Sequence, residues 1–276
     1  MRKEKIRQND FTLKDLPKTR LEQFKDLFIH RFVTLLKLSF LQTVFLLPSL
    51  VIIIMFYIFI RGATDYNAFF SVVLFSTLGL LICIPIAYIG YTGLFHSLKL
   101  MCFMEGEFEA SSFFIGIKEE WKKGLIIGMI HSLSICLTII GIAYLIGYVS
   151  EDIAWLKGFG IAILVIQLIV VTMVVRYAIS EISIYKNAMR YVLKNSFLFT
   201  LMRFPINLLF VIISPGISIA LISIMEITSY IGVALIIIFN AFTSLMWMLN
   251  SIATFDKYIN KENNPDFYKK GLYKGE

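Results

Sequence analysis

The residues of this chain whose chemistry could carry a function are polar side chains placed inside long apolar segments. They are Gln42, His131, Gln167, Asn207, Asn240 and Asn250, with Arg176 and Arg203 near predicted segment ends. Polar groups inside a membrane are costly, and they often mark a substrate pathway. We therefore take His131, Arg203 and Asn207 as a candidate polar path. A single amide of this kind also commonly forms a hydrogen bond between helices, and a boundary arginine commonly extends to lipid phosphates.

The motifs of common enzyme classes are missing from the sequence. It has no HExxH, no G-x-S-x-G, no P-loop and no pair of aspartates inside an apolar segment. Its three histidines are far apart, so a histidine-based metal site is not expected. Proton-coupled transport usually needs a carboxylate in the membrane, and Glu181 and Glu226 fall only near segment ends. We predict a protein that is not an enzyme and that binds no cofactor or metal.

Four small residues recur at every fourth position in one apolar segment. They are Gly124, Gly128, Ser132 and Cys136. Small side chains at this spacing let two helices approach closely, as in the GxxxG motif. We therefore predict a helix-packing stripe whose partner is another helix of the same chain. Association into a homo-oligomer is the alternative.

The composition indicates the kind of protein that holds these residues. The chain of 276 residues is 58% hydrophobic and 16% charged, and its mean hydropathy is +0.78. A soluble domain carries roughly 25% charged residues, so this chain has too few polar side chains to cover its surface in water. Its uncharged runs approach the ~20 residues that cross a bilayer as a helix. We therefore predict an all-α, polytopic membrane protein embedded in the lipid bilayer.

Six apolar segments are expected to span the membrane. They lie near residues 38–60, 68–95, 124–149, 155–179, 197–222 and 228–254. Short links join the first to the second, the third to the fourth and the fifth to the sixth, and short links join antiparallel neighbours. This pattern predicts three helical hairpins within a transmembrane domain of residues 38–254. Residues 1–37 are predicted as a tail and an interfacial amphipathic helix, and residues 255–276 as a second tail.

The distribution of basic residues predicts the orientation. Of the 26 lysines and arginines, all except Arg61 and Lys157 fall in the tails and in the long connectors. Basic residues are retained on the cytoplasmic side, so both termini and the amphipathic connecting helices are expected in the cytoplasm. The net charge of +7 is explained by this topology, and a nucleic-acid partner is not expected.

The connector between the second and third segments is the longest mixed polar stretch. Its glutamates Glu105, Glu107 and Glu109 alternate with small or apolar residues and predict an acidic turn. An amphipathic helix follows, with Phe113, Phe114, Ile117 and Trp121 on one side. We interpret the three glutamates and Trp121 as a candidate docking surface. A solvated elbow between two helices is the alternative.

The same connector carries a resemblance to a known family. Residues Gly90 to Glu107, Phe113 to Gly124, Tyr185 to Phe197 and Asn264 to Leu272 resemble the YesL-like integral membrane proteins of bacteria. That resemblance implies a multi-pass protein of the bacterial plasma (inner) membrane, often encoded beside carbohydrate ABC uptake systems. It further implies a non-enzymatic accessory role in carbohydrate uptake, with ABC permease subunits or another membrane protein as partner. A stand-alone small-solute transporter or channel is the alternative class.

Overall fold

The computed structural model describes residues 16–105, 110–213 and 228–273, with only the backbone described for residues 228–238. These parts of the chain are helical, and no strand occurs in them. The helices are α1 (Arg20–His30), α2 (Phe32–Arg61), α3 (Tyr66–Phe103), α4 (Ala110–Tyr148), α5 (Ala154–Ile184), α6 (Met189–Met202), α8 (Thr228–Phe255) and α9 (Lys261–Asn263). A further helix spans Phe204–Ile213, and the segment Asp256–Asn260 forms a π-helical turn.

Four helices, α2 to α5, are long and apolar enough to cross a membrane. The mean hydropathy of their most apolar 18-residue stretches is 2.3 to 2.7, and between 11% and 33% of each stretch is buried inside the protein. Large apolar side chains such as Val51, Phe75 and Ile163 are exposed on their outer faces. Such surfaces are stable when lipid covers them. The described helices therefore have the construction of a multi-pass membrane protein.

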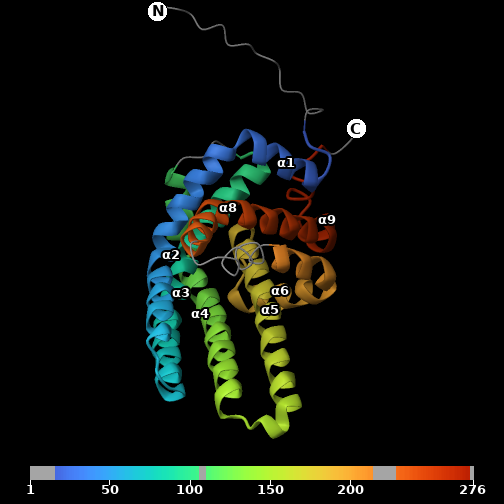
Figure 1. The fold of residues 1–276 in the computed structure, drawn as a ribbon. Helices are drawn as coiled ribbons and strands as arrows, with labels where there is room; N and C mark the ends of the chain where they lie inside the picture. The colour runs from blue at the N-terminus through green and yellow to red at the C-terminus, as the bar shows by residue number, and fades with distance from the viewer. Residues whose placement is uncertain (1–15, 106–109, 214–227, 274–276) are drawn as a thin grey trace, which may run out of the picture.

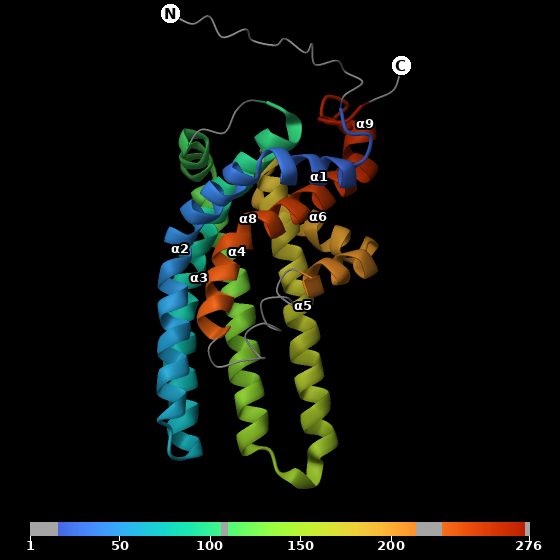
Figure 2. The ribbon, with the colours of Figure 1, turned by 45° about the horizontal axis from the view of Figure 1, so that its top comes forward.

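The four long helices form two neighbouring pairs (Figures 1 and 2). A short turn at residues 62–65 joins α2 to α3, and residues 149–153 join α4 to α5 at the same end of the molecule. The carboxylate of Asp65 caps α3 by accepting a hydrogen bond of 2.8 Å from the backbone N–H of Ala68. These turns close both pairs at the end of the molecule far from the chain termini.

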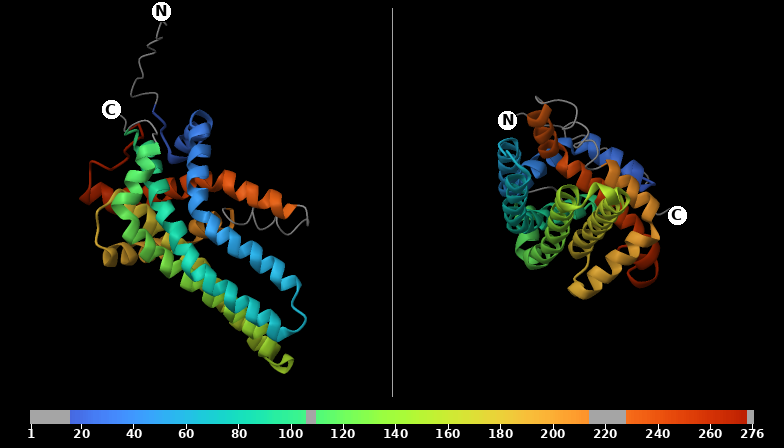
Figure 3. Two further views of the ribbon diagram at one scale, coloured as in Figure 1. Left: turned by 90° about the vertical axis from the view of Figure 1, so that its left-hand side faces the viewer. Right: turned by 60° about the horizontal axis from the view of Figure 1, so that its bottom comes forward.

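The predicted fifth and sixth segments take a different course. The predicted span 197–222 begins inside α6, and the chain bends by 94° between α6 and the helix Phe204–Ile213. The bend follows from Pro205, which lacks a backbone N–H and fits the first turn of a new helix. In Figures 1 and 3, α8 crosses the bundle of long helices instead of running parallel to it. Counting the bent pair as one span gives up to five candidate spans among the residues that the structure describes.

A second body of helices, which we call the head, lies at the end of the molecule opposite the two short turns (Figure 2). It consists of α1, the adjoining ends of α3, α4 and α5, α6, and residues 240–273. The largest fully buried side chains of the described residues belong mainly to it, and they include Phe95, Phe113, Tyr177, Trp247 and Phe255. Helices α3 and α4 have 38 and 39 residues, close to 57 Å at ~1.5 Å per residue. They therefore extend well beyond a ~30 Å hydrocarbon layer.

Three predicted elements differ in detail from the observed ones. The amphipathic helix expected from Leu21 to Lys37 breaks at Arg31, so that α1 and α2 are separate helices. Leu27 is buried on α1 whereas Leu21 is 66% exposed, so the apolar face is narrower than the sequence suggests. Residues 256–273, expected to be part of a tail, are a folded part of the head. The amphipathic connector after residue 110 is the first part of α4 and not a separate helix.

Candidate functional site

The predicted packing stripe on α4 faces α3 of the same chain. A Cβ atom added at Gly124 would lie 2.4 Å from Cγ2 of Thr92, and one added at Gly128 would lie 2.6 Å from the Cα atom of Pro85. The side chain of Ser132 is fully buried, and its hydroxyl donates to a carbonyl of its own helix. Cys136 donates from its thiol to the carbonyl oxygen of Thr77 at 3.1 Å. The stripe therefore serves contact between α3 and α4.

The stripe continues further toward the head than the four predicted residues. A Cβ atom added at Gly116 would lie 2.4 Å from Cβ of His96, and the hydroxyls of Ser112 and Ser97 lie 3.2 Å apart. Ser112 and Gly116 lie on the same four-residue register as Gly124, but Glu120 interrupts the run of small residues between them. This continuation was missed because these residues fall in a segment assigned to a separate amphipathic helix.

Two of the three residues of the candidate polar path meet in one buried cluster. The carboxamide oxygen of Asn207 accepts hydrogen bonds from the Tyr177 hydroxyl at 2.8 Å and from the Asn250 amide at 3.1 Å. The guanidinium of Arg203 donates to the hydroxyl of Thr254 at 2.9 Å, and that hydroxyl lies 3.2 Å from the Tyr177 hydroxyl. We call these five residues the asparagine cluster. It ties the bent segment after α6 to α5 and α8.

The third residue of the path, His131, lies in a different cluster. Its Nδ1 atom lies 2.8 Å from the Tyr88 hydroxyl, and its Nε2 atom lies 3.2 Å from the Thr172 hydroxyl. These contacts join α3, α4 and α5. Within the described part of the chain, no hydrogen bond links His131 to the asparagine cluster. The three residues therefore do not form one continuous path there.

Near the His131 cluster, the guanidinium of Arg176 lies 5.0 Å from the centroid of the Tyr91 ring. The hydroxyl of Tyr91 donates to the carboxamide oxygen of Asn240 at 2.9 Å. No carboxylate of the described residues forms an ion pair with Arg176. The sequence identified Arg176 and Asn240 as intramembrane polar residues, but it gave no indication that both contact Tyr91.

The candidate docking residues are only partly described. Glu105 forms an ion pair with Lys270 of the folded C-terminal segment, whereas Glu107 and Glu109 lie outside the described residues. Trp121 is 43% exposed, and Phe114 is 54% exposed. Phe113 is fully buried, so the predicted apolar side of this helix is divided between the core and the surface.

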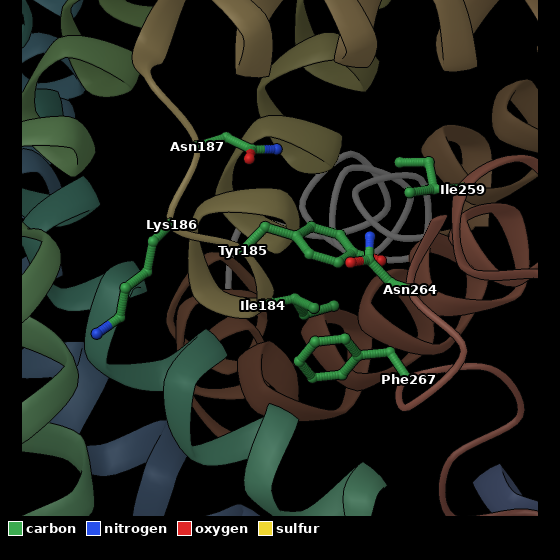
Figure 4. A pocket seen from close by; sticks show the side chains of 7 residues that line it. All are labelled: Ile184, Tyr185, Lys186, Asn187, Ile259, Asn264 and Phe267. Carbon is green, nitrogen blue, oxygen red and sulfur yellow. The ribbon is translucent and has the colours of Figure 1, made fainter. Parts of the chain in front are cut away.

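A cavity of about 440 Å³ opens on the head, in the range typical of small-molecule sites (Figure 4). Its lining consists of Ile184, Tyr185, Lys186, Asn187, Ile259, Asn264 and Phe267. The rings of Tyr185 and Phe267 meet edge to face, with centroids 5.7 Å apart. The sequence did not predict this cavity, because the non-helical link after α5 and the C-terminal segment come together only in the fold.

Behind this cavity lies the buried carboxyl group of Glu181. One of its oxygens, Oε1, accepts hydrogen bonds from the amides of Asn187 at 3.0 Å and Asn195 at 2.9 Å. Its other oxygen, Oε2, is buried and has no hydrogen-bond partner. Burial raises the pKa of the Glu181 carboxyl, and the two amide donors oppose that shift only in part. Glu181 thereby fixes the link between α5 and α6 on the wall of the cavity.

A polar contact between distant parts of the chain holds the head together. The side-chain amide of Gln23 donates to the carbonyl oxygens of Cys102 at 2.6 Å and Gly271 at 3.3 Å. Arg20 and Asp256 form an ion pair of 2.8 Å whose side chains are each 11% exposed. We call these five residues the terminal junction, because they join α1 and the C-terminal segment to α3.

Gly271 and Cys102 make the closest contact of the terminal junction. Gly271 has a φ angle of 76°, and an added Cβ atom would lie 2.1 Å from the carbonyl oxygen of Cys102. Only glycine therefore fits at this position. Burial also raises the pKa of the Cys102 thiol to about 12.

Comparisons with known proteins add no assignment to this geometry. No protein-family model, curated protein or solved structure matches the chain. Among the residues that the structure describes, no group of three or more His, Cys, Asp or Glu side chains is placed to hold a metal ion.

Proposed function

We propose that this protein is a non-enzymatic accessory component of a carbohydrate uptake system in the plasma membrane of a bacterium. Its long helices α2 to α5 cross the membrane, and its head lies in the cytoplasm and binds another membrane protein. The observation that carries this proposal is an exposed apolar surface on the head, on the part of α4 that extends beyond the bilayer.

The length of α4, compared with the thickness of the bilayer, supports this interpretation. From Tyr148 at the far end of the helix, Trp121 is about 40 Å away and Phe114 about 51 Å away at 1.5 Å per residue. A bilayer with its headgroup regions is about 40–45 Å thick. Trp121 therefore sits at the depth of an interfacial aromatic belt. Phe114 and the neighbouring Ile115, which are 54% and 47% exposed, extend past the lipid, where a protein partner would cover them.

The charge distribution supports a cytoplasmic head. Arg61 and Lys157 are the only basic residues of the chain near the two short turns, whereas the other basic residues lie in or next to the head or in the tails. Thr64 and Glu262 are exposed positions at the two ends of the molecule. A cysteine placed at Thr64 should react with a membrane-impermeant thiol reagent on intact cells, and one at Glu262 only after the cells are opened. The reverse labelling pattern would contradict the orientation.

The resemblance to the YesL-like proteins supports the choice of partner. It makes ABC permease subunits for carbohydrates the first candidates, and nothing in the head requires nucleic acid. The test is affinity purification in mild detergent together with sugar uptake in cells that lack the protein. The proposal predicts recovery of a permease or signalling partner and reduced uptake. Recovery of no such partner with unaltered uptake would count against it.

The second candidate is a stand-alone transporter or channel for small solutes. The observation that favours it is the presence of two buried polar clusters in the helical bundle, around His131 and around Asn207. Purified protein in liposomes would then carry a substrate flux. That flux should be lost when His131, Arg203 or Asn207 is replaced, whereas the accessory role predicts no flux in any variant.

A further inference from the structure

Arg176 on α5 is a positive charge without a matching negative charge in the described part of the chain. No described carboxylate pairs with it, and the nearby acid on the same helix, Glu181, accepts its hydrogen bonds from two asparagines. An arginine cannot lose its proton in a protein. The attraction to the Tyr91 ring at 5.0 Å offsets only part of the cost of removing the charge from water. An oxyanion beside Arg176 would supply the negative charge that the described side chains around it lack.

Asn240 on α8 provides an unsatisfied donor beside the same tyrosine. Its side-chain oxygen accepts from the Tyr91 hydroxyl at 2.9 Å, so its amide group must find an acceptor elsewhere. That amide nitrogen is buried without a partner, and the whole residue is only 7% exposed. Arg176 and Asn240 thus both contact Tyr91, the first at its ring and the second at its hydroxyl. Guanidinium and amide donors together suit the oxygen atoms of a phosphate or carboxylate.

The other groups around Arg176 are neutral or positive. Tyr88 and Tyr91 belong to α3, His131 to α4 and Thr172 to α5, and these side chains already bond to one another or to Asn240. None of them carries a negative charge at neutral pH. An oxyanion at Arg176 would meet no repulsion from the described side chains.

The depth of the site indicates where the anion comes from. Trp155 lies at the far end of α5, 74% exposed, and Arg176 is about 30 Å from it along the helix at 1.5 Å per residue. That distance equals the ~30 Å thickness of the hydrocarbon layer, so Arg176 lies at the level of the lipid headgroups on the side of the head. We propose that Arg176, Asn240 and Tyr91 bind a phosphate oxyanion carried by an anionic lipid.

The test uses the purified full-length chain in a zwitterionic detergent. The Tm is measured without additive, with phosphatidylglycerol, with phosphatidylcholine and with inorganic phosphate, and bound lipid is counted by native mass spectrometry. Phosphatidylglycerol near saturation should raise the Tm of the wild type by about 5 °C or more. It should be retained as one lipid per chain, whereas phosphatidylcholine should not.

Variants then assign the effect to the site. R176Q should lose the response to phosphatidylglycerol. N240L should need about tenfold more phosphatidylglycerol than the wild type for the same rise in Tm. R190Q, which changes an exposed arginine of the head, should respond as the wild type does. If R176Q does not fold, the site is tested with N240L and with R176K, which retains the charge. R176K should show a smaller rise in Tm with phosphatidylglycerol than the wild type.

The remaining outcomes are equally decisive. If inorganic phosphate also raises the Tm of the wild type but not that of R176Q, the oxyanion site is supported and its ligand is a soluble anion. The absence of any response in the wild type would overturn the site, and so would equal responses of the wild type, R176Q and N240L. E226Q tests a counter-ion from outside the described residues: a stronger lipid response in E226Q than in the wild type would show that Glu226 pairs with Arg176 within the chain, which overturns the proposal.

Discussion

Among the described carboxyl groups of the head, Glu181 is fully buried and has hydrogen-bond donors at only one of its two oxygens. Its side chain is inaccessible to solvent, and two asparagine amides donate to one oxygen while the other has no partner. An ionised carboxylate in this position would be poorly solvated. Burial therefore raises the pKa of Glu181. The carboxyl group contributes to folding best when it is protonated.

The pH dependence follows from the direction of this pKa shift. A carboxyl whose pKa is raised in the folded state stabilises the fold fully below its unfolded pKa of about 4.3. That stabilisation is lost as the pH rises through the raised value. E181Q keeps the acceptor oxygen and removes the ionisation. It should unfold at a Tm near that of the wild type at pH 4 and at a higher Tm at pH 8.

Thermal unfolding of both proteins between pH 4 and pH 8 measures this difference. E119Q, which changes an exposed glutamate of α4, is the matched control and should follow the wild type. If E181Q loses stability at pH 8 relative to the wild type, Glu181 is ionised and paired in the folded state, and our description of its environment is wrong.

At the scale of the elements, the contact between α3 and α4 is the part of the fold that sequence periodicity anticipates best. Small residues at every fourth position predict a close helix–helix contact, and the structure places Gly124 and Gly128 against Thr92 and Pro85. Breaks between helices were harder to predict. The chain bends near Arg203 because Pro205 starts a new helix, although apolar residues continue through the bend. Hydropathy alone does not distinguish a bent pair of helices from one span.

Gly128 offers a direct test of this contact. A Cβ atom at Gly128 would lie 2.6 Å from a backbone atom of Pro85, which cannot rotate away. G128A should therefore destabilise the protein by about 1–3 kcal/mol, as overpacking does. G158A is the matched control, since nothing lies within 4 Å of a Cβ atom at Gly158. It should be neutral or more stable by up to about 1 kcal/mol, because alanine favours helices.

The two glycine variants can be compared by reversible denaturation in detergent micelles. Equal stability of G128A and the wild type would mean that α3 and α4 are not in close contact at Pro85. Loss of stability in G158A alone would place the tight contact on α5 instead.

At the scale of the whole molecule, the head is the feature that the sequence anticipated least. Composition and charge predicted a membrane protein with long basic connectors, because both signals are sums over many residues. The terminal junction depends on individual polar contacts between Arg20 and Asp256 and between Gln23 and Gly271. These residues are separated by most of the chain, and no local pattern marks them. The cavity beside Tyr185 was missed for the same reason.

The terminal junction should control the accessibility of Cys102. In the native protein this thiol is fully buried, and its pKa is raised to about 12, so little reactive thiolate forms at pH 8. D256N leaves Arg20 without its partner and should cost roughly 2 kcal/mol, less than for a fully buried pair. Local opening of the junction then increases, and alkylation of Cys102 by iodoacetamide should accelerate about tenfold.

Peptide-level mass spectrometry measures the alkylation of Cys102 separately from that of the other cysteines. K257Q is the matched control, because Lys257 follows Asp256 in the sequence and its side chain is exposed. Equal alkylation rates of Cys102 in D256N and the wild type would show that the ion pair does not hold the C-terminal segment in place.

The most direct test of the accessory role is site-specific photo-cross-linking in cells. A photoreactive phenylalanine analogue replaces Phe114 on the head or, as the control, Phe75, which is 77% exposed on the apolar face of α3. We predict that the analogue at position 114 cross-links to a subunit of a membrane uptake system, whereas the one at position 75 does not. Cross-linking of neither position to another protein, in cells that actively take up carbohydrate, would contradict the account.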